Sequence, residues 1–280
     1  MNHNIIFILI LIISIFFIYN YFTLVSKEAL KNSKNIRVAV CFFGLTRSLK
    51  HTINSINKNI LNPLKNSNID YDIILHTYDL KYLKLKRSRE NNKLDTNEWK
   101  LLKPIKSQID NQDEFDKIYD YKYVKSFGDA WNTKYENTMN VIRQLNSLKQ
   151  VWKLSETTNK KYDCYLFIRP DLKYTTKLDT NEIMMSLKSN NENTIYTPSW
   201  HKGVNGLNDR IAMGNPKVMK IYANRLDDVN DYLKTTKKAL HAESFLKYVI
   251  EKNNIQNKTI NLIGKRVRIN GNIPAGNHQL

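Results

Sequence analysis

A charged turn interrupts an apolar run in the sequence Tyr165-Leu-Phe-Ile-Arg-Pro-Asp-Leu-Lys-Tyr174. The apolar run is typical of a buried strand, and charged residues are rarely buried unless they are paired. Pro170 fixes its own φ and pushes Arg169 towards extended geometry. The turn is therefore stiff, and it aims the side chains of Arg169 and Asp171 in a fixed direction.

Two other strand-like runs also end in polar residues. The first ends in Gly44-Leu-Thr-Arg47-Ser48, and the second ends in His76-Thr-Tyr-Asp79. In open α/β sheets, ligands bind in the crevice beyond the carboxyl ends of the strands. We therefore expect Arg47 and Asp171 to face one crevice.

The elements that position these tips begin with a strand, a helix and a second strand. Residues 36–43 are mostly apolar and end at Gly44, and residues 71–76 form the second short strand. Between them, from about Arg47 to Leu64, apolar residues recur at spacings of three and four, which predicts an amphipathic helix. A strand, helix and strand in so short a segment predict a βαβ unit and a parallel sheet.

The rest of the chain predicts further strands and helices around the same core. Residues 80–125 are charged and weakly patterned, which indicates an insertion with short helices such as 113–119. The longest helix is expected over 131–155, with an inner stripe of Met139, Ile142, Leu145, Leu148 and Trp152. Further helices are expected over 179–188, from Pro216 and over 241–250, and strands over 194–197, 210–213 and 261–269. With no internal repeat and no second core, residues 36–280 predict a single α/β domain with a mixed, mainly parallel sheet and flanking helices.

An uncharged apolar segment lies near the start of the chain, at residues 5–25. About 20 apolar residues suffice to cross a bilayer, so residues 1–25 predict a membrane anchor and residues 26–35 a short stem. A cleaved signal peptide is the alternative, although no small-residue cleavage site follows. The lysines after the span favour an orientation with the C-terminal domain in the cytosol. In the type II arrangement, in the ER, the Golgi or an equivalent host or viral membrane, the domain would lie in the lumen. The orientation stays open.

The net charge of +18 comes from a general excess of lysine over acidic residues. Only Lys81–Arg89 forms a dense basic tract, which predicts a solvated loop or helix face, and no nucleic-acid-binding signature accompanies it. Cys41 and Cys164 both lie in apolar runs, so we expect two buried thiols and neither a disulfide framework nor a cysteine zinc site.

Taken together, several ordered motifs resemble a known family. They are "RVAVCFFGLTRSLKHTINSI", "DYDIILHTYD", "FIRPDLKY", "GLNDRIAMGN" and "HAESFL", which lie within residues 36–249. In this order they resemble the small GT-A-type glycosyltransferases of large DNA viruses, protists and bacteria. The resemblance implies a GT-A-like (Rossmann-like) fold. It also implies a membrane-anchored enzyme that moves a sugar from a nucleotide-diphosphate donor to a glycan or protein hydroxyl.

The resemblance also implies roles on the donor side. Gly44 and Arg47 would lie near the nucleotide, and Asp79 would accept a hydrogen bond from its ribose or base. Asp171 would be the metal-facing carboxylate of a DxD-type motif, holding Mn²⁺ or Mg²⁺ at the diphosphate. Here Arg169 occupies the position of the first Asp, so it either neutralises the diphosphate itself or pairs with Asp171. One carboxylate is a poorer metal site than two.

On the acceptor side, the resemblance implies two further groups. The substrate-binding residues would be Trp200, His201, Asn208 and Arg210, with the indole stacking on a sugar face. Asp209 and Glu243 would join Asp171 as catalytic carboxylates, with Glu243 as general base or acceptor anchor.

Two other functions compete with this interpretation. Gly44–Ser48 is similar to the phosphosulfate loop of type II membrane sulfotransferases, in which a glycine turn and a helix N-terminus hold phosphate. The usual Gly-Thr after Arg-Ser is replaced by Leu49-Lys50. A non-catalytic module that binds polyanions or anionic membranes through Lys81–Arg89 is the third interpretation.

Overall fold

The computed structural model describes residues 36–85 and 90–274. The predicted anchor and stem, residues 1–35, lie outside the described residues. Within the described part of the chain, no helix has both the length and the apolar character that a membrane span requires. The residues from Arg37 onward form one compact unit.

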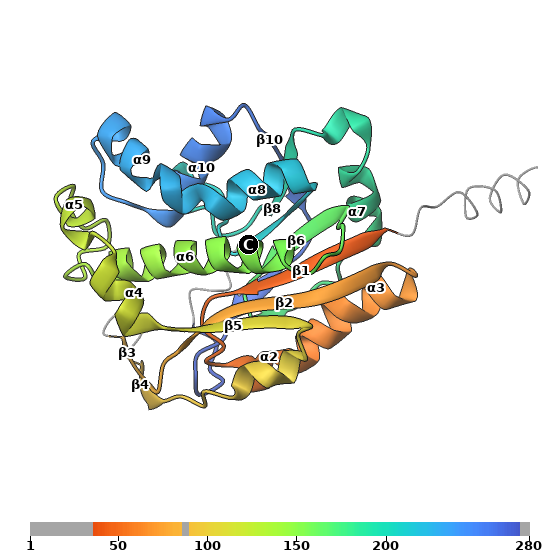
Figure 1. The fold of residues 1–280 in the computed structure, drawn as a ribbon, viewed down its shortest axis with the longest axis horizontal. Helices are drawn as coiled ribbons and strands as arrows, with labels where there is room; N and C mark the ends of the chain where they lie inside the picture. Colours follow the sequence, from red (N-terminus) through yellow and green to blue (C-terminus); the bar gives the residue numbers. More distant parts are fainter. Residues whose placement is uncertain (1–35, 86–89, 275–280) are drawn as a thin grey trace, which may run out of the picture. The chain divides into compact units, whose positions relative to one another are not determined.

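A seven-stranded sheet forms the centre of this unit (Figure 1). Its strands lie in the order β10 (Gln256–Ile260), β8 (Thr194–Pro198), β9 (Ile211–Gly214), β6 (Cys164–Ile168), β1 (Arg37–Phe43), β2 (Asp70–Asp79) and β5 (Lys106–Asn111). Every neighbouring pair is parallel except the two pairs that contain β9. The predicted mixed, mainly parallel α/β sheet is confirmed.

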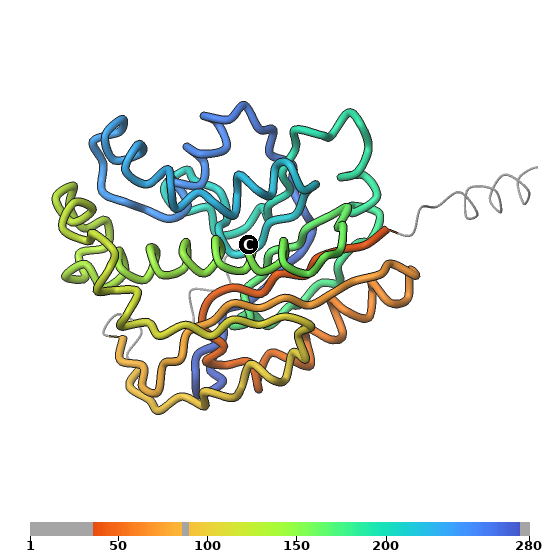
Figure 2. Tube along the Cα trace, in the orientation of Figure 1, coloured from red at the N-terminus to blue at the C-terminus, as the bar shows by residue number. Residues whose placement is uncertain are grey.

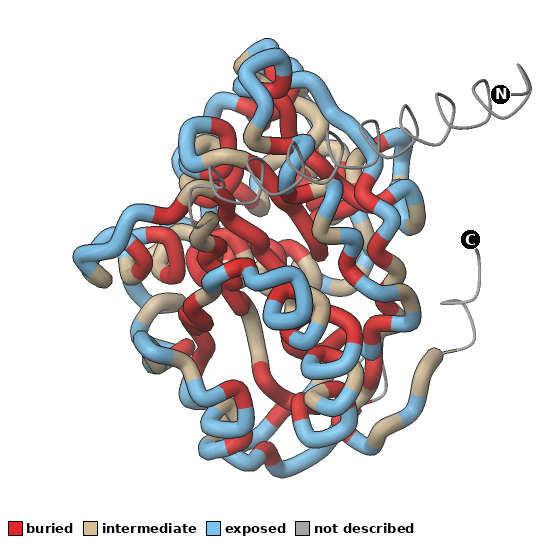
Figure 3. Tube along the Cα trace, turned by 90° about the vertical axis from the view of Figure 1, so that its right-hand side faces the viewer, coloured by how far each residue is buried: buried red, intermediate tan, exposed pale blue. Residues whose placement is uncertain are grey.

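Helices cover both faces of the sheet because its central strands are apolar on both sides. Ala39, Cys41 and Phe43 of β1 pack into one core cluster with α6 (Glu136–Glu156), α8 (Pro216–Asn224), α9 (Val229–Thr236) and α10 (Ala242–Lys252). On the other face lie α2 (Leu49–Ile56) and α3 (Asn62–Asn66), together with α7 (Thr180–Ser186), whose Ser186 hydroxyl lies 3.9 Å from Cys164 Sγ of β6. The buried segments in Figure 3 follow these strands and the inner sides of the helices.

Most of the predicted elements are present near their expected bounds. The strand at 36–43 pairs in parallel with the strand that contains 71–76, and the helix between them runs through a π-helical segment, Asn57–Leu61. The longest described helix is α6, and four of its five predicted stripe residues are buried, Met139 being only partly so. Both cysteines are free and buried, as expected.

Three expectations are wrong in part. Residues 80–125 contain short helices as expected, α4 (Gln112–Ile118) and α5 (Tyr121–Lys125). They are not only an insertion, because β5 extends the main sheet beside β2. Residues 82–85 of the basic tract form a strand, β3, while 86–89 lie outside the described residues. The strand expected at 261–269 is replaced by β10 and by β11 (Gly264–Arg266). Both β5 and β10 are polar edge strands, which do not show the apolar pattern of a central strand.

Two small sheets bring distant segments to the end of β6. The hairpin of β3 (Tyr82–Leu85) and β4 (Glu90–Lys93) packs through Leu83 and Leu94 on Ile269. The strand β7 (Leu172–Tyr174) pairs with β11, and the backbone N–H of Val267 continues this pairing by donating to the carbonyl of Asp171. In Figure 2 the last described segment, in dark blue, lies beside the start of α2.

Candidate functional site

The polar residues predicted at the ends of the strands meet where the order of the strands in the sheet reverses. Numbered along the chain, β5, β2, β1 and β6 are the third, second, first and fourth strands of the sheet, so the order turns between β1 and β6. Such a switch point opens a crevice at the carboxyl ends of the strands. Gly44 follows β1 and Arg169 follows β6. Because Ile211 of the reversed strand β9 pairs with Ile168, Arg210 lies at the same edge.

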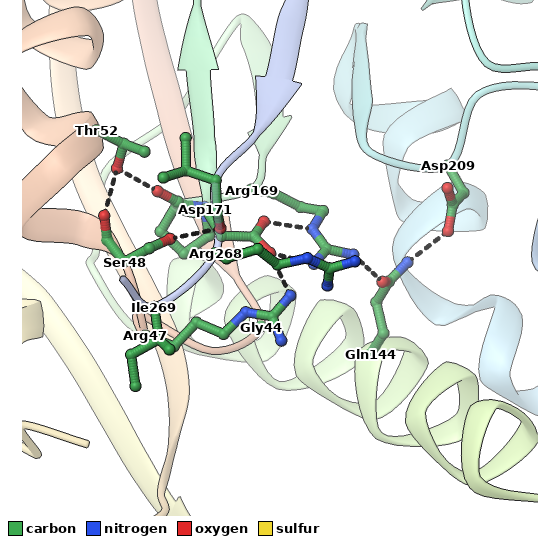
Figure 4. A network of polar contacts seen from close by, with 12 residues as sticks. Gly44, Arg47, Ser48, Thr52, Gln144, Arg169, Asp171, Asp209, Arg268 and Ile269 are labelled. Carbon is green, nitrogen blue, oxygen red and sulfur yellow. Dashed lines mark hydrogen bonds and ion pairs between the residues drawn. The ribbon is translucent and has the colours of Figure 1, made fainter. Parts of the chain in front are cut away.

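Asp171 is held by two arginines at this edge (Figure 4). Arg169 donates from Nε to Asp171 Oδ1 at 2.8 Å and from Nη2 to Oδ2 at 2.7 Å, and Arg47 Nη2 donates to Oδ2 at 3.0 Å. Asp171 is 1% exposed. Burial alone would raise its pKa, but the guanidiniums of Arg169 and Arg47 lower the pKa well below its usual range. Asp171 is therefore an ionised anchor for two arginines.

This arrangement does not fit the metal site that the resemblance implies. Both oxygens of Asp171 already accept from guanidiniums. Among the described residues, no group of three or more His, Cys, Asp and Glu side chains is placed to hold a metal ion. Mn²⁺ and Mg²⁺ need several oxygen ligands. Arg169 pairs with Asp171, which is one of the two roles open to it.

A glutamine links Asp171 to the second acidic position. Arg169 Nη1 donates to Gln144 Oε1 at 2.7 Å, and Gln144 Nε2 donates to Asp209 Oδ2 at 2.7 Å. Figure 4 shows this chain of contacts crossing from the end of β6 to the start of β9 through α6. Residues 47, 171 and 209 therefore belong to one polar network.

Besides Gln144, three residues at the network were not predicted: Glu90, Arg266 and Arg268. Glu90 Oε2 accepts from Arg268 Nη1 at 2.9 Å and from Arg47 Nη1 at 3.4 Å, and Glu90 Oε1 accepts from the N–H of Ile269 at 3.2 Å. Arg266 lies two residues before Arg268, in the strand that pairs with β7. The Arg-x-Arg spacing at the end of a strand-like run was the available signal, since alternate strand residues share a face.

A carboxylate and two histidines form a second group at this edge. His201 Nε2 lies 3.6 Å from Glu243 Oε1, and His241 Nδ1 lies 3.4 Å from Glu243 Oε2. Burial and the nearby charge of Asp209 raise the pKa of Glu243 to about 7. Glu243 is thus poised to exchange a proton near neutral pH, which suits a general base.

The loop before β9 is shaped by its own hydrogen bonds. Asn208 is fully buried, donates to the carbonyl of Trp200 at 2.7 Å and accepts from the N–H of Arg210 at 2.9 Å. Its side chain thus holds the loop and is not free to bind sugar hydroxyls. The Arg210 guanidinium lies 5.7 Å from the centre of the Trp200 ring. At Gly206 an added Cβ would lie 2.2 Å from the backbone of Glu243, so glycine is needed for this close approach.

Of the donor-side residues, Gly44 lies next to the network and Asp79 does not. Gly44 has φ +89°, and an added Cβ would meet no atom within 4 Å, so this turn borders open space. Asp79 is exposed at the end of β2 and takes no part in the network.

A buried chain of hydrogen bonds holds the Gly44 turn from behind. The Gly44 N–H donates to Ser147 Oγ at 2.8 Å, Ser147 Oγ lies 2.8 Å from His76 Nδ1, and His76 Nε2 lies 3.0 Å from Asp110 Oδ2. The order Asp, His, Ser is that of a nucleophilic triad. However, His76 and Ser147 have no exposed surface, so no substrate reaches the hydroxyl. The chain is a support for the turn.

We expect Ser147→Ala to lower the free energy of unfolding by about 1–3 kcal/mol, because it leaves the N–H of Gly44 without its buried acceptor. Thermal and urea unfolding measure this. Ser126→Ala is the matched control, since the Ser126 hydroxyl is exposed and donates only to a local carbonyl. Equal effects of the two variants would contradict the supporting role of Ser147.

Comparison with known proteins identifies a family for this chain but gives no function. The chain matches the family model of a domain of unknown function, DUF7796, over residues 33–263. No curated protein matches the chain.

Proposed function

Because the chain belongs to the DUF7796 family, whose function is unknown, we propose a function from the geometry of the site. We propose that the protein is a glycosyltransferase that uses a nucleotide-diphosphate sugar. The observation that carries the proposal is the grouping of an arginine-rich network and a carboxyl of raised pKa at one switch point of the sheet. The arginine network suits a diphosphate leaving group, and the carboxyl of Glu243 suits removal of a proton from an acceptor hydroxyl.

The proposed reaction divides the work between these groups. The acceptor oxygen forms a bond to the anomeric carbon of the sugar, and the bond between that carbon and the diphosphate oxygen breaks. Glu243 takes the hydroxyl proton, and the charge of Arg210 acts on the Glu243 carboxyl and links it electrostatically to the network. The arginines stabilise the negative charge that develops on the departing diphosphate.

The fold supports the proposal at a coarse level. The third, second, first and fourth strands form a Rossmann-like half with a ligand crevice at its switch point. The remaining strands, one of them reversed, continue the sheet. This arrangement is compatible with the GT-A-like fold that the motif resemblance implies.

One observation speaks against the sulfotransferase alternative. In that interpretation Ser48 belongs to a loop that holds phosphate. Ser48 is fully buried, and its hydroxyl donates to the carbonyl of Val267 at 3.1 Å. The hydroxyl is therefore occupied by the segment that brings Arg266 and Arg268 to the site.

A ligand screen separates the three functions. The full-length chain, purified in mild detergent, is tested by thermal shift with uridine and guanosine diphosphate sugars, with adenosine 3′-phosphate 5′-phosphosulfate and with heparin. The proposal predicts stabilisation by a nucleotide sugar that Arg169→Gln abolishes and Arg37→Gln, at the other end of β1, does not. Stabilisation by the phosphosulfate alone, or by heparin alone, would contradict it.

A further inference from the structure

We propose that the arginine cluster, defined as Arg47, Arg169, Arg210, Arg266 and Arg268, binds a diphosphate group directly and without a divalent cation. This inference rests on the proposed function, because it assigns the diphosphate of the donor to a stated set of residues. It departs from the metal-dependent binding that the DxD-type motif implies. The described residues provide guanidiniums where a metal site needs free carboxylates.

The charges of the cluster do not cancel. The five guanidiniums are grouped with the four carboxyl groups of Asp171, Glu90, Asp209 and Glu243. Counted over these described residues, the group carries one excess positive charge when Glu243 is ionised and two when it is protonated. A bound anion of two negative charges would balance the larger excess.

Burial and neighbouring like charges lower the pKa of three of the five arginines. Burial, together with the guanidiniums of Arg210, Arg268 and Arg169, lowers the pKa of Arg266 to about 9. Burial also lowers the pKa of Arg210 and of Arg268, and the neighbouring guanidiniums add to this. An anion among these side chains would remove the repulsion and favour their charged forms.

The geometry also favours an anion of more than one phosphoryl group. Arg47 and Arg169 reach the cluster from the ends of β1 and β6, and Arg266 and Arg268 reach it from the segment that pairs with β7. Arg47 is buried, and its Nε–H has no acceptor among the described residues. Guanidiniums from separate elements can each donate bidentate hydrogen bonds to different phosphate oxygens.

Calorimetry on the full-length chain in detergent tests this inference with inorganic pyrophosphate as the probe. In the presence of EDTA we expect pyrophosphate to bind and to bind more tightly than inorganic phosphate. Arg266→Gln and Arg268→Gln should each weaken the binding about tenfold or more, because each loses a charge-assisted contact. Lys265→Gln is the matched control, since it removes the same charge from the adjacent residue, which points to the opposite face of β11.

Three outcomes would overturn the inference. They are no binding of pyrophosphate in EDTA, binding that appears only when Mn²⁺ replaces EDTA, and equal loss of affinity in Lys265→Gln and the two arginine variants. Unfolding curves of all variants show whether a loss reflects misfolding, and the second arginine variant keeps the test decisive if the first is unstable. Turnover of nucleotide sugars is measured separately: sugar transfer that strictly needs Mn²⁺ would overturn this inference and leave the proposed function standing.

Discussion

Asp171→Asn is expected to lower the free energy of unfolding by about 3–5 kcal/mol and to abolish donor binding, because it leaves two buried guanidiniums without their counter-charge. Asn keeps the shape of the side chain, so the loss reports charge and not packing. Asp171 acts through Arg169 and Arg47, which it holds in place at the ends of β6 and β1. Urea unfolding at pH 7 and nucleotide-sugar binding measure the two effects.

The pH dependence of stability gives this prediction a second readout. A carboxyl whose pKa is lower in the folded state contributes stability that is complete above its ordinary pKa of 3.8 and is lost as the pH falls further. The wild type should therefore lose stability below about pH 4 more steeply than Asp171→Asn. Asp70→Asn, at the exposed start of β2, is the control. An Asp171→Asn variant as stable as that control would show that the buried ion pairs are not needed.

Glu243→Gln is expected to reduce sugar transfer by about 10²–10⁴-fold while leaving the fold intact, because the amide cannot accept the proton of the acceptor hydroxyl. In the wild type, transfer should rise with pH and level off above about pH 7, where Glu243 becomes ionised. That rise should be absent from the residual activity of the variant. Initial rates across the pH range, at saturating donor, measure both effects.

The stability of Glu243→Gln should change in the opposite direction to its activity. A raised carboxyl pKa stabilises the folded state at low pH, and this contribution is lost as the pH rises from about 4.5 to about 7. At pH 8 the variant should therefore be more stable than the wild type, by roughly 1–3 kcal/mol. Glu251→Gln, on the exposed side of the same helix, should change neither property. A stable variant that kept full transfer activity would rule out Glu243 as the base.

The sequence predicts the central strands and long helices because burial on both faces leaves a clear apolar pattern. β1 and β6 are almost wholly apolar, and α6 carries a regular stripe. The edge strands were not predicted because they are not buried on both faces. β5 and β10 are held by backbone hydrogen bonds to one neighbour and carry polar side chains, so they show no apolar pattern.

The candidate site was predictable where residues follow a strand directly. Arg47, Arg169 and Asp171 follow β1 and β6, whose carboxyl ends meet at one edge of the sheet, whereas Asp209 reaches that edge because it precedes the reversed strand β9. Glu90 and Arg268 come from segments that reach the site only through the small sheets and the Ile269 contact. Glu90 leaves no local signal of this pairing in the sequence, and the Arg-x-Arg spacing of residues 266–268 is the one signal for Arg268. The metal role of Asp171 was drawn from a motif, and the two arginines that donate to both carboxylate oxygens do not fit that role.

The most direct test of the proposed function is the release of nucleoside diphosphate from a panel of nucleotide sugars by the full-length chain, with and without an acceptor glycan. Our account predicts turnover of at least one donor in EDTA, lost in Glu243→Gln and retained in Glu251→Gln. Absence of turnover and of binding for every donor, with a correctly folded protein, would contradict it.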